Sequence, residues 1–237
     1  MTTVVLLSGG LDSAVLLAHE AERASVHPVY VSVGLAWERA EEAMLDALLA
    51  SRAFQKNVLP LARLEFSMRD VYAPTHWAIR GAPPAYDTPD TDVYLAGRNL
   101  VFLTKAGVVA STLKASRIVL GTLSNNPFPD ATPEFFGAMS RALSLGLAHP
   151  VAIDTPLAGM HKEDVIRLGS RLGVPFEFTL SCMNPQPQAA PLAPLPVHCG
   201  LCSKCRERRD AFAVAGVDDP TPYANPSPRP STSLGAP

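Results

Sequence analysis

The residues best suited to binding or catalysis form a hexapeptide that follows an apolar run and opens a predicted helix. They are Ser8, Gly9, Gly10, Leu11, Asp12 and Ser13. Two adjacent glycines allow a tight turn and a close approach to a ligand, and the free N–H groups at a helix start attract an anion. A carboxylate beside a phosphate predicts a cation between them, and Mg²⁺ takes such oxygen ligands. The pattern favours a phosphate-binding loop over an ordinary Gly-Gly turn with a serine cap. It is not a Walker A loop, because the chain has no Gly-Lys-Ser/Thr.

A second cluster lies near the C-terminus, where all four cysteines follow the spacing C-x16-C-x2-C-x2-C. They are Cys182, Cys199, Cys202 and Cys205. Four thiolates suffice for a closed tetrahedral zinc site, which indicates a structural ion rather than a catalytic one. A disulfide pair and a redox C-x-x-C are the alternatives. We favour zinc, because the start of the chain lacks the features of a secretory signal and a reducing setting is expected.

The elements that must position these groups alternate along residues 1 to about 175. Short runs rich in Val, Ile and Leu are typical of parallel strands that are covered on both faces. The predicted strands are Thr3–Leu7, Val29–Val33, Asn57–Leu59, Arg117–Leu120 and Val151–Ile153. The predicted helices are Ser13–Arg23, Glu38–Arg52, Asn99–Leu113, Pro133–Leu145 and Lys162–Leu172. This alternation predicts an α/β fold with a doubly wound parallel sheet, which binds ligands at the carboxyl ends of its strands.

Composition excludes several classes of protein. The chain has 237 residues, 47% of them hydrophobic and 18% charged, with a net charge of −2. That charge argues against nucleic acid as a partner. The sequence contains no run of about 18 apolar residues, which a membrane span would require, so we expect a cytoplasmic protein.

Three segments are expected along the chain. Residues 1–178 form the α/β domain, and residues 179–217 form a small zinc-binding element with a C-terminal helix. Residues 218–237 are predicted to be a disordered tail, because from Pro220 onward they hold six prolines and no acidic residue. The stretch from Pro60 to Gly97 shows no clear pattern, which predicts a lid or an insertion.

The hexapeptide resembles the SGGxDS loop of the PP-loop ATP pyrophosphatases, whose fold is adenine nucleotide alpha hydrolase-like. Combined with the cysteine spacing, the chain resembles the 7-cyano-7-deazaguanine synthase family from residue 1 to about 215. Further matching segments are Leu95–Leu103 with the family's PGRN-x-x-FL, Asp154–Leu157 with its TPL, Lys162, Ser181-Cys182, and Pro129-Asp130 with Glu134-Phe135.

The resemblance implies a reaction in which ATP adenylates 7-carboxy-7-deazaguanine and ammonia displaces AMP to give an amide. A second ATP then drives dehydration to the nitrile. It implies ATP, Mg²⁺ and structural Zn²⁺ as cofactors, with the hexapeptide, Arg98 and Gly121 binding ATP. Asp12, Arg98 and Lys162 are the expected catalytic residues. The expected substrate-binding residues are Asn125, Asn126, Phe128, Asp130 and Glu134, and Trp37 or Phe128 could stack on the base.

Three features depart from the family pattern. The segment after the second strand reads Ser32–Trp37 instead of Asp-Tyr-Gly-Gln, and the loop Leu123–Thr132 lacks a Cys-Arg pair. The span between Cys182 and Cys199 is long and rich in proline. Three alternatives therefore stay open: a paralogue that adenylates another small-molecule or protein carboxylate, an RNA-modifying PP-loop enzyme, and a non-catalytic nucleotide-binding partner. A homodimer and a separate protein that supplies ammonia also stay open as partners.

Overall fold

A parallel β-sheet forms the centre of the molecule, which a computed structural model describes for residues 2–187 and 195–228. Within those residues the sheet has five strands in the order β3-β2-β1-β4-β5, and every pairing is parallel. The strands are β1 (Thr3–Leu6), β2 (Val26–Ser32), β3 (Ala62–Glu65), β4 (Arg117–Val119) and β5 (Ala152–Asp154). The strand order reverses between β1 and β4, and ligands bind beside such a switch point in open α/β sheets.

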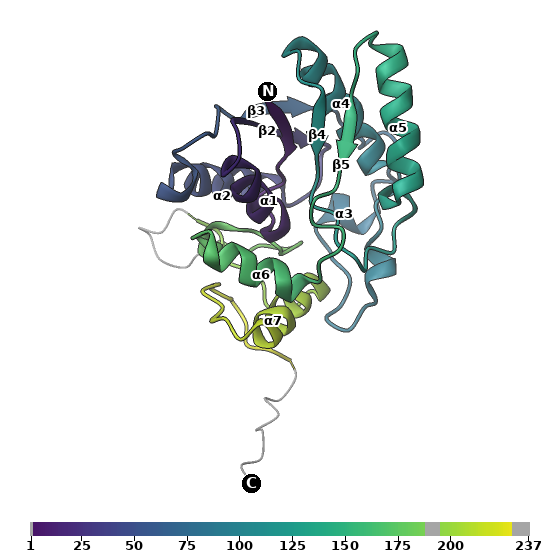
Figure 1. The fold of residues 1–237 in the computed structure, drawn as a ribbon. Helices are drawn as coiled ribbons and strands as arrows, with labels where there is room; N and C mark the ends of the chain where they lie inside the picture. The colour runs from purple at the N-terminus through teal and green to yellow at the C-terminus, as the bar shows by residue number, and fades with distance from the viewer. Residues whose placement is uncertain (1, 188–194, 229–237) are drawn as a thin grey trace.

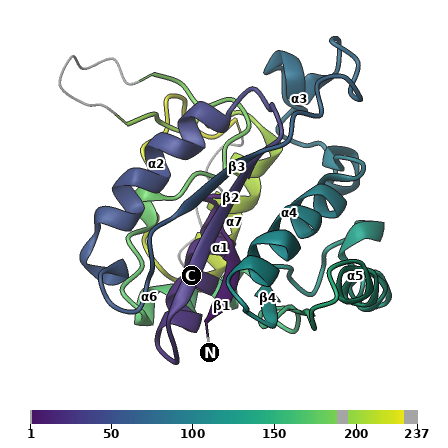
Figure 2. The same ribbon diagram turned by 90° about the horizontal axis from the view of Figure 1, so that it is seen from above.

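Helices cover both faces of the sheet (Figures 1 and 2), which confirms the doubly wound architecture. On one face lie α1 (Leu11–Ala21), α2 (Glu38–Ala50) and α6 (Lys162–Arg171), and on the other lie α4 (Arg98–Thr112) and α5 (Pro133–Gly146). The C-terminal helix α7 (Ser203–Ala215) packs against α6, at the end of the sheet toward which β4 and β5 point. All five helices predicted from the sequence are present, with ends within two residues of the prediction.

Alternating side chains of the strands explain why both faces are covered. In β1, Val4 and Leu6 belong to the hydrophobic cluster under α4 and α5. Their neighbours Val5 and Leu7 belong to the cluster under α1, α2 and α6. Successive strand side chains point to opposite faces, so a strand that is apolar at every position must be buried on both sides.

The third strand differs from the prediction. Residues 57–59 make only an isolated bridge, between Val58 and Val26, and β3 begins at Ala62. Asn57 adopts a positive φ of 62°, a conformation that interrupts an extended strand. Its side-chain amide donates a hydrogen bond to the carbonyl of Ala21, which anchors this turn to the end of α1.

The segment from Pro60 to Gly97 contains β3 and the short helix α3 (Trp77–Arg80). The side chain of His76 accepts a hydrogen bond from the N–H of Ala78 and so caps α3. Trp77 stacks on Trp37, with ring centroids 5.8 Å apart, which attaches α3 to the loop after β2. Whether this segment acts as a lid stays a prediction.

The prediction of a disordered tail is wrong for residues 218–228. This stretch lies along the cysteine-rich element, where His198 N–H donates to Pro222 O and Ala224 N–H donates to His198 O. The guanidinium of Arg209 stacks on the Tyr223 ring at 3.9 Å. Proline-rich composition suggested too little apolar surface for folding, but backbone pairing and one aromatic anchor hold the segment. Residues 229–237 lie outside the described part of the chain. Across the described residues, no helix combines the length and the hydropathy that crossing a membrane requires.

Candidate functional site

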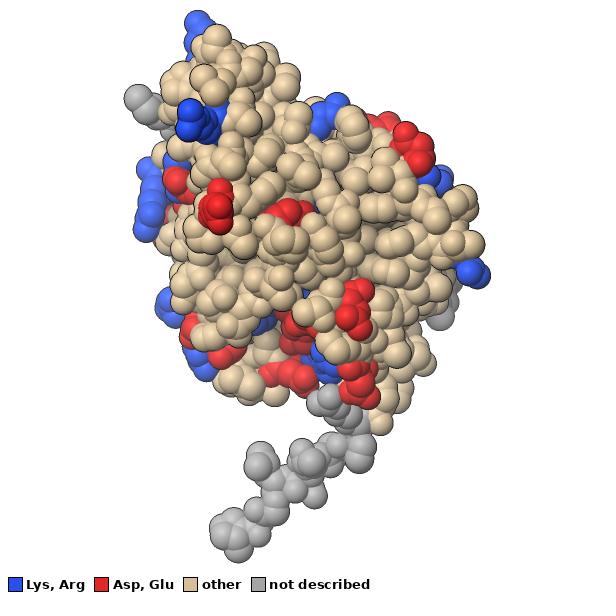
Figure 3. Space-filling model, turned by 90° about the vertical axis from the view of Figure 1, so that its right-hand side faces the viewer, with Lys and Arg blue, Asp and Glu red and all other residues tan. Residues whose placement is uncertain are grey.

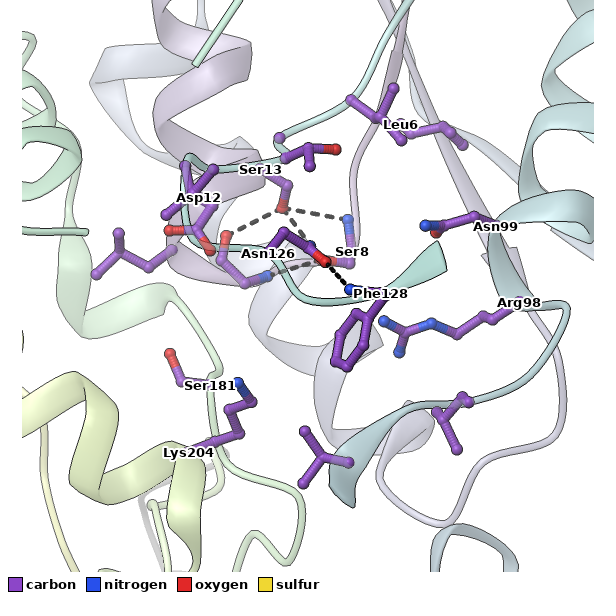
Figure 4. Close-up of a pocket in the computed structure, with 18 of the residues that line it drawn as sticks. Leu6, Ser8, Asp12, Ser13, Arg98, Asn99, Asn126, Phe128, Ser181 and Lys204 are labelled. Carbon is purple, nitrogen blue, oxygen red and sulfur yellow. Dashed lines mark hydrogen bonds between the residues drawn. The ribbon is translucent and has the colours of Figure 1, made fainter. Parts of the chain in front are cut away.

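A cavity of about 500 Å³ opens at the carboxyl ends of β1, β2 and β4. It is lined by the hexapeptide, by the N-terminal ends of α4 and α6, by the loop after β4 and by helix α7. Most of the residues predicted from the sequence meet here: Ser8, Gly10, Leu11, Asp12, Ser13, Trp37, Arg98, Gly121, Asn125, Asn126, Phe128 and Lys162. The structure therefore brings the predicted ATP site and much of the predicted substrate site into one space (Figure 4).

The hexapeptide is held in shape by its own hydroxyl groups. Ser13 Oγ donates to Gly10 O at 3.0 Å and accepts the N–H of Ser8 at 3.2 Å, and Ser8 Oγ accepts the N–H of Gly10. Gly9 has a φ of +78°, which a residue with a side chain rarely adopts. Gly10 is the N-cap of α1 and offers no side chain to its first N–H groups. Unfilled N–H groups at a helix start form a ready anion site.

Gly121 lets the loop after β4 approach the hexapeptide. A Cβ at this position would lie 3.3 Å from the backbone C and O atoms of Asp12. That spacing is tighter than ordinary contacts, so a larger residue would push the two loops apart. Gly121 thus acts through close packing against the phosphate loop.

Asp12 and Lys162 form an ion pair inside the cavity. Lys162 Nζ donates to Asp12 Oδ2 at 2.8 Å and contacts Glu207 Oε1 at 2.9 Å. Burial alone would lower the pKa of Lys162, but the charges of Asp12 and Glu207 raise it above its usual value. Among the described residues, Asp12 Oδ1 is buried and has no hydrogen-bond partner. A buried carboxylate oxygen without a donor fits a cation ligand, which is the role expected of Asp12 toward Mg²⁺.

Arg98 is the first residue of α4 and points into the cavity (Figure 4). Its guanidinium lies 5.6 Å from the centre of the Phe102 ring. Within the described residues the salt bridges do not include Arg98. An accessible guanidinium opposite the phosphate loop can bind the oxygens of a phosphate or a carboxylate.

The loop after β4 places three predicted substrate residues at the cavity wall. Asn126 Oδ1 accepts the N–H of Phe128 at 3.0 Å, so this amide shapes a turn. Asn125 Nδ2 lies 3.2 Å from His161 Nδ1, and the Phe128 ring stacks on Tyr94 at 5.2 Å. Phe128 therefore presents one face of a fixed ring pair.

Three other predicted residues do not line the cavity. Asp130 is buried and accepts the N–H of Asn99 at 3.2 Å, so it holds the start of α4 in place behind Arg98. Glu134 is exposed in the first turn of α5. Gly9 faces Leu45 of α2 and contributes its backbone conformation. The direct substrate contacts expected of Asp130 and Glu134 are not supported by these positions.

The structure adds acidic residues that the sequence reasoning missed. Glu38 and Glu41 both line the cavity from the first turn of α2. Glu38 accepts hydrogen bonds from Ser32 Oγ, Val33 N–H and Gly34 N–H and so fixes the loop after β2. A pair of acids three residues apart at a helix start was a visible signal, because such residues share one helix face.

Glu41 is the second acid of this pair. Its carboxylate accepts the hydroxyl of Tyr30 at 2.9 Å and the indole N–H of Trp37 at 3.0 Å. Burial and the negative charge of Glu38 raise the pKa of Glu41 to about 7. The Tyr30 and Trp37 hydrogen bonds and the charge of Arg98 act in the opposite direction. A carboxyl group with such a pKa in a cleft is a candidate for a functional role.

Helix α7 also contributes to the cavity. Lys204 contacts Glu207 Oε2 at 2.6 Å and Asp90 Oδ1 at 3.3 Å, and all three line the cavity. Burial alone would raise the pKa of Glu207, but the charges of Lys162 and Lys204 lower it to about 2. A chain of alternating charges therefore joins Asp12, Lys162, Glu207 and Lys204. Lys204 therefore faces the cavity and its acidic neighbours rather than open solvent.

The four cysteines converge beneath this end of α7. Their Sγ atoms all lie within 4.8 Å of one another, and all four residues are buried. Tetrahedral zinc–thiolate bonds of about 2.3 Å would separate the sulfurs by about 3.8 Å. The distances of 3.9 Å from Cys199 to Cys205 and 3.5 Å from Cys202 to Cys205 fit that arrangement. The cysteines are not joined by disulfides, so the cluster can hold a metal ion.

Comparisons with known proteins agree with this arrangement. The profile of a family described as "Queuosine biosynthesis protein QueC" matches residues 2–216. The 7-cyano-7-deazaguanine synthase of Methanothermobacter thermautotrophicus is 32% identical over 232 residues, covering 94% of this chain and 99% of that protein. The enzyme of the same name from Thermosynechococcus vestitus is 34% identical, covering 93% and 95%. The one from Anaeromyxobacter dehalogenans is 35% identical, with the same coverage.

Proposed function

This chain belongs to the queuosine biosynthesis protein QueC family, and we propose that it is an ATP-dependent ligase that makes 7-cyano-7-deazaguanine. The proposed substrates are 7-carboxy-7-deazaguanine and ammonia. The observation that carries the proposal is the single cavity that joins the phosphate loop, the unpartnered oxygen of Asp12 and the guanidinium of Arg98.

In the proposed reaction a carboxylate oxygen attacks the α-phosphorus of ATP, and pyrophosphate leaves. Ammonia then attacks the acyl carbon and AMP leaves, giving the amide. The amide oxygen then attacks the α-phosphorus of a second ATP and pyrophosphate leaves; loss of two protons from nitrogen and of AMP from carbon gives the nitrile. Negative charge develops on the departing phosphate oxygens in each activation step. The N–H groups of the phosphate loop and Arg98 face the space where that charge appears, and preorganised donors lower the barrier of such a step.

We propose that Asp12 holds Mg²⁺ through Oδ1, while Lys162 holds Oδ2 and fixes the orientation of the carboxylate. A bound Mg²⁺ neutralises charge on the phosphates. Zinc at the four cysteines would be structural, since it leaves no open ligand position. We infer a reducing compartment, in keeping with a cytoplasmic location, because these cysteines are not joined by disulfides and so remain able to bind zinc.

Among the alternatives, RNA modification gains no support from the face of the molecule that Figure 3 shows. On the face shown in Figure 3, basic side chains are scattered near the edges and do not form a continuous band. A large substrate of this kind needs a basic platform. The homodimer and an ammonia-supplying protein stay predictions.

The proposal is tested by measuring AMP and pyrophosphate with ATP, Mg²⁺ and ammonia, with and without 7-carboxy-7-deazaguanine. We expect AMP release that depends on this acid and a nitrile product by mass spectrometry. If the protein binds ATP but AMP release does not respond to this acid, the proposal is wrong. The chain would then be a paralogue that uses another carboxylate.

A further inference from the structure

Glu41 occupies a position from which it can read the edge of a planar ligand. Each of its carboxylate oxygens accepts one hydrogen bond, from Tyr30 and from Trp37 respectively. A carboxylate has about four acceptor positions, so one position remains on each oxygen. The side chain lines the cavity, and its two fixed partners prevent it from rotating away.

The wall around Glu41 is aromatic. Trp37 and Trp77 are stacked within 10° of parallel, and both line the cavity. Helix α2 packs against the phosphate loop, since a Cβ on Gly9 would lie 3.5 Å from the carbonyl oxygen of Glu41. A ligand held by Glu41 therefore lies in the same cavity as the phosphate loop.

We propose that Glu41 is the specificity-determining residue for the base and accepts two adjacent N–H donors of a guanine-type edge. This inference rests on the proposed function and deepens it by naming the group that recognises the substrate. A guanine-type ring presents N1–H and the 2-amino group side by side, which matches the paired oxygens of a carboxylate. Adenine presents one donor beside an acceptor, so the same carboxylate discriminates against the base of ATP.

The charges around Glu41 are consistent with this role. Glu38 accepts three hydrogen bonds, from Ser32 and from the backbone of the loop after β2, whereas Glu41 accepts two and keeps one acceptor position on each oxygen. The raised pKa of Glu41 shows that its ionised form is poorly solvated before a ligand arrives. Two N–H donors would supply the missing hydrogen bonds.

The experiment uses intrinsic fluorescence, because Trp37 and Trp77 are the two tryptophans of the chain and both lie at this site. The full-length zinc-loaded protein is titrated with 7-deazaguanine, with 7-deazahypoxanthine, which lacks the 2-amino group, and with 7-deazaadenine. The same titrations are made with Glu41→Gln, with Glu41→Asp and with the control Glu42→Gln on the same helix. Thermal unfolding of each variant verifies that it is folded.

In the wild-type protein we expect 7-deazaguanine to bind about 10- to 100-fold more tightly than 7-deazahypoxanthine, as expected for a hydrogen bond to a charged group. In Glu41→Gln this preference should fall below about 3-fold, because the amide offers one acceptor and one donor. Glu41→Asp should keep part of the preference, and Glu42→Gln should keep all of it.

Three outcomes overturn the inference: no preference for 7-deazaguanine in the wild-type protein, a preference for 7-deazaadenine, or an unchanged preference in Glu41→Gln. AMP release is measured on the same samples with 7-carboxy-7-deazaguanine. A preference that depends on Glu41 without AMP release supports the inference and contradicts the proposed reaction. AMP release with a preference that is unaffected by Glu41→Gln contradicts only the inference.

Discussion

Glu207 on α7 lies 2.9 Å from Lys162 at the start of α6, and Lys162 in turn holds Asp12 of the phosphate loop at 2.8 Å. Glu207 is two residues beyond Cys205, the last of the clustered cysteines. The cysteine-rich element is therefore connected to the phosphate loop through one lysine. Lys162 contacts Oδ2 of Asp12, and Oδ1 of the same carboxylate has no hydrogen-bond partner among the described residues.

The first prediction concerns this shared lysine. In Glu207→Gln, Lys162 loses one of its two charged partners and should pair more strongly with Asp12, in competition with Mg²⁺. We expect kcat/KM for ATP to fall by roughly 10-fold, the size of one charge-assisted contact, and the Mg²⁺ concentration at half-maximal rate to rise. The control is Glu177→Gln at an exposed position. An unchanged Mg²⁺ dependence in Glu207→Gln would contradict the coupling.

The second prediction concerns Asp12 itself. Asp12→Asn removes the charge that is expected to bind Mg²⁺ but keeps the size of the side chain. AMP and pyrophosphate formation should fall at least about 100-fold, as for the loss of a group that stabilises developing charge. The melting temperature should change little, since the side chain is part of the cavity wall. Asp46→Asn, at an exposed surface ion pair, serves as the control. Full turnover by Asp12→Asn would rule out the assigned role.

Much of the fold could be predicted because the signals for its strands and helices lie in short stretches of the sequence. The apolar strands at Val4–Leu6 and the helix signals at Pro133 and Gly173 are visible in a single sequence, and the structure agrees with them. The third strand was predicted too early, because the positive φ of Asn57 depends on a contact with Ala21 in a distant helix. The ordering of residues 218–228 also depends on long-range pairing, with His198.

The candidate site also has a part that could be predicted from the sequence and a part that could not. The phosphate loop and the cysteines have fixed spacings, so their positions could be predicted and the cavity and the sulfur cluster contain them. Asp130 was assigned to the substrate from a motif, yet it supports the start of α4. Glu41 was missed, because its role depends on Tyr30 and Trp37 meeting it across the loop after β2. Motifs identify the reacting end of the site, and tertiary contacts form the end that reads the base.

The third prediction concerns the metal. The purified protein should contain about one zinc ion per chain, because the four sulfurs fit one tetrahedral ion. Chelation under reducing conditions should unfold the segment around α7, since binding free energy at such sites is folding free energy. ATP affinity should fall in parallel, because Glu207 and Lys204 lie on that helix. Metal analysis without zinc, or ATP affinity that survives chelation, would contradict this prediction.

The fourth prediction concerns the segment after α7. Arg208 is fully buried, and its guanidinium contacts Thr221 Oγ1 at 2.6 Å and Asp219 Oδ1 at 3.6 Å. Asp219→Ala leaves this buried charge without its acidic partner and should cost about 2–4 kcal/mol of unfolding free energy. Asp218→Ala, at the exposed neighbouring position, should cost less than about 0.5 kcal/mol. Denaturant unfolding of the zinc-loaded protein compares the two. Equal effects would mean that residues 218–228 do not stabilise the element.

The fifth prediction concerns the pH dependence of stability at Glu41. The groups that face this carboxyl are Tyr30 on β2, Trp37 and Glu38 at the start of α2, and Arg98 on α4. Its pKa is about 7 in the folded protein and 4.5 as an ordinary value. The folded state therefore binds more protons than the unfolded state between these values, and the contribution of Glu41 to stability is lost as the pH rises from 4.5 to about 7.

Glu41→Gln removes this titration and keeps acceptors and donors of similar size. At pH 8 the variant should be more stable than the wild-type protein, by about 1–3 kcal/mol for a shift of this order. The difference should shrink toward pH 5, where the wild-type carboxyl is protonated. Urea unfolding at pH 5, 6, 7 and 8 measures it, and Glu42→Gln should show no such trend. A stability difference that does not change with pH would mean that Glu41 is well solvated and is not held ready for two N–H donors.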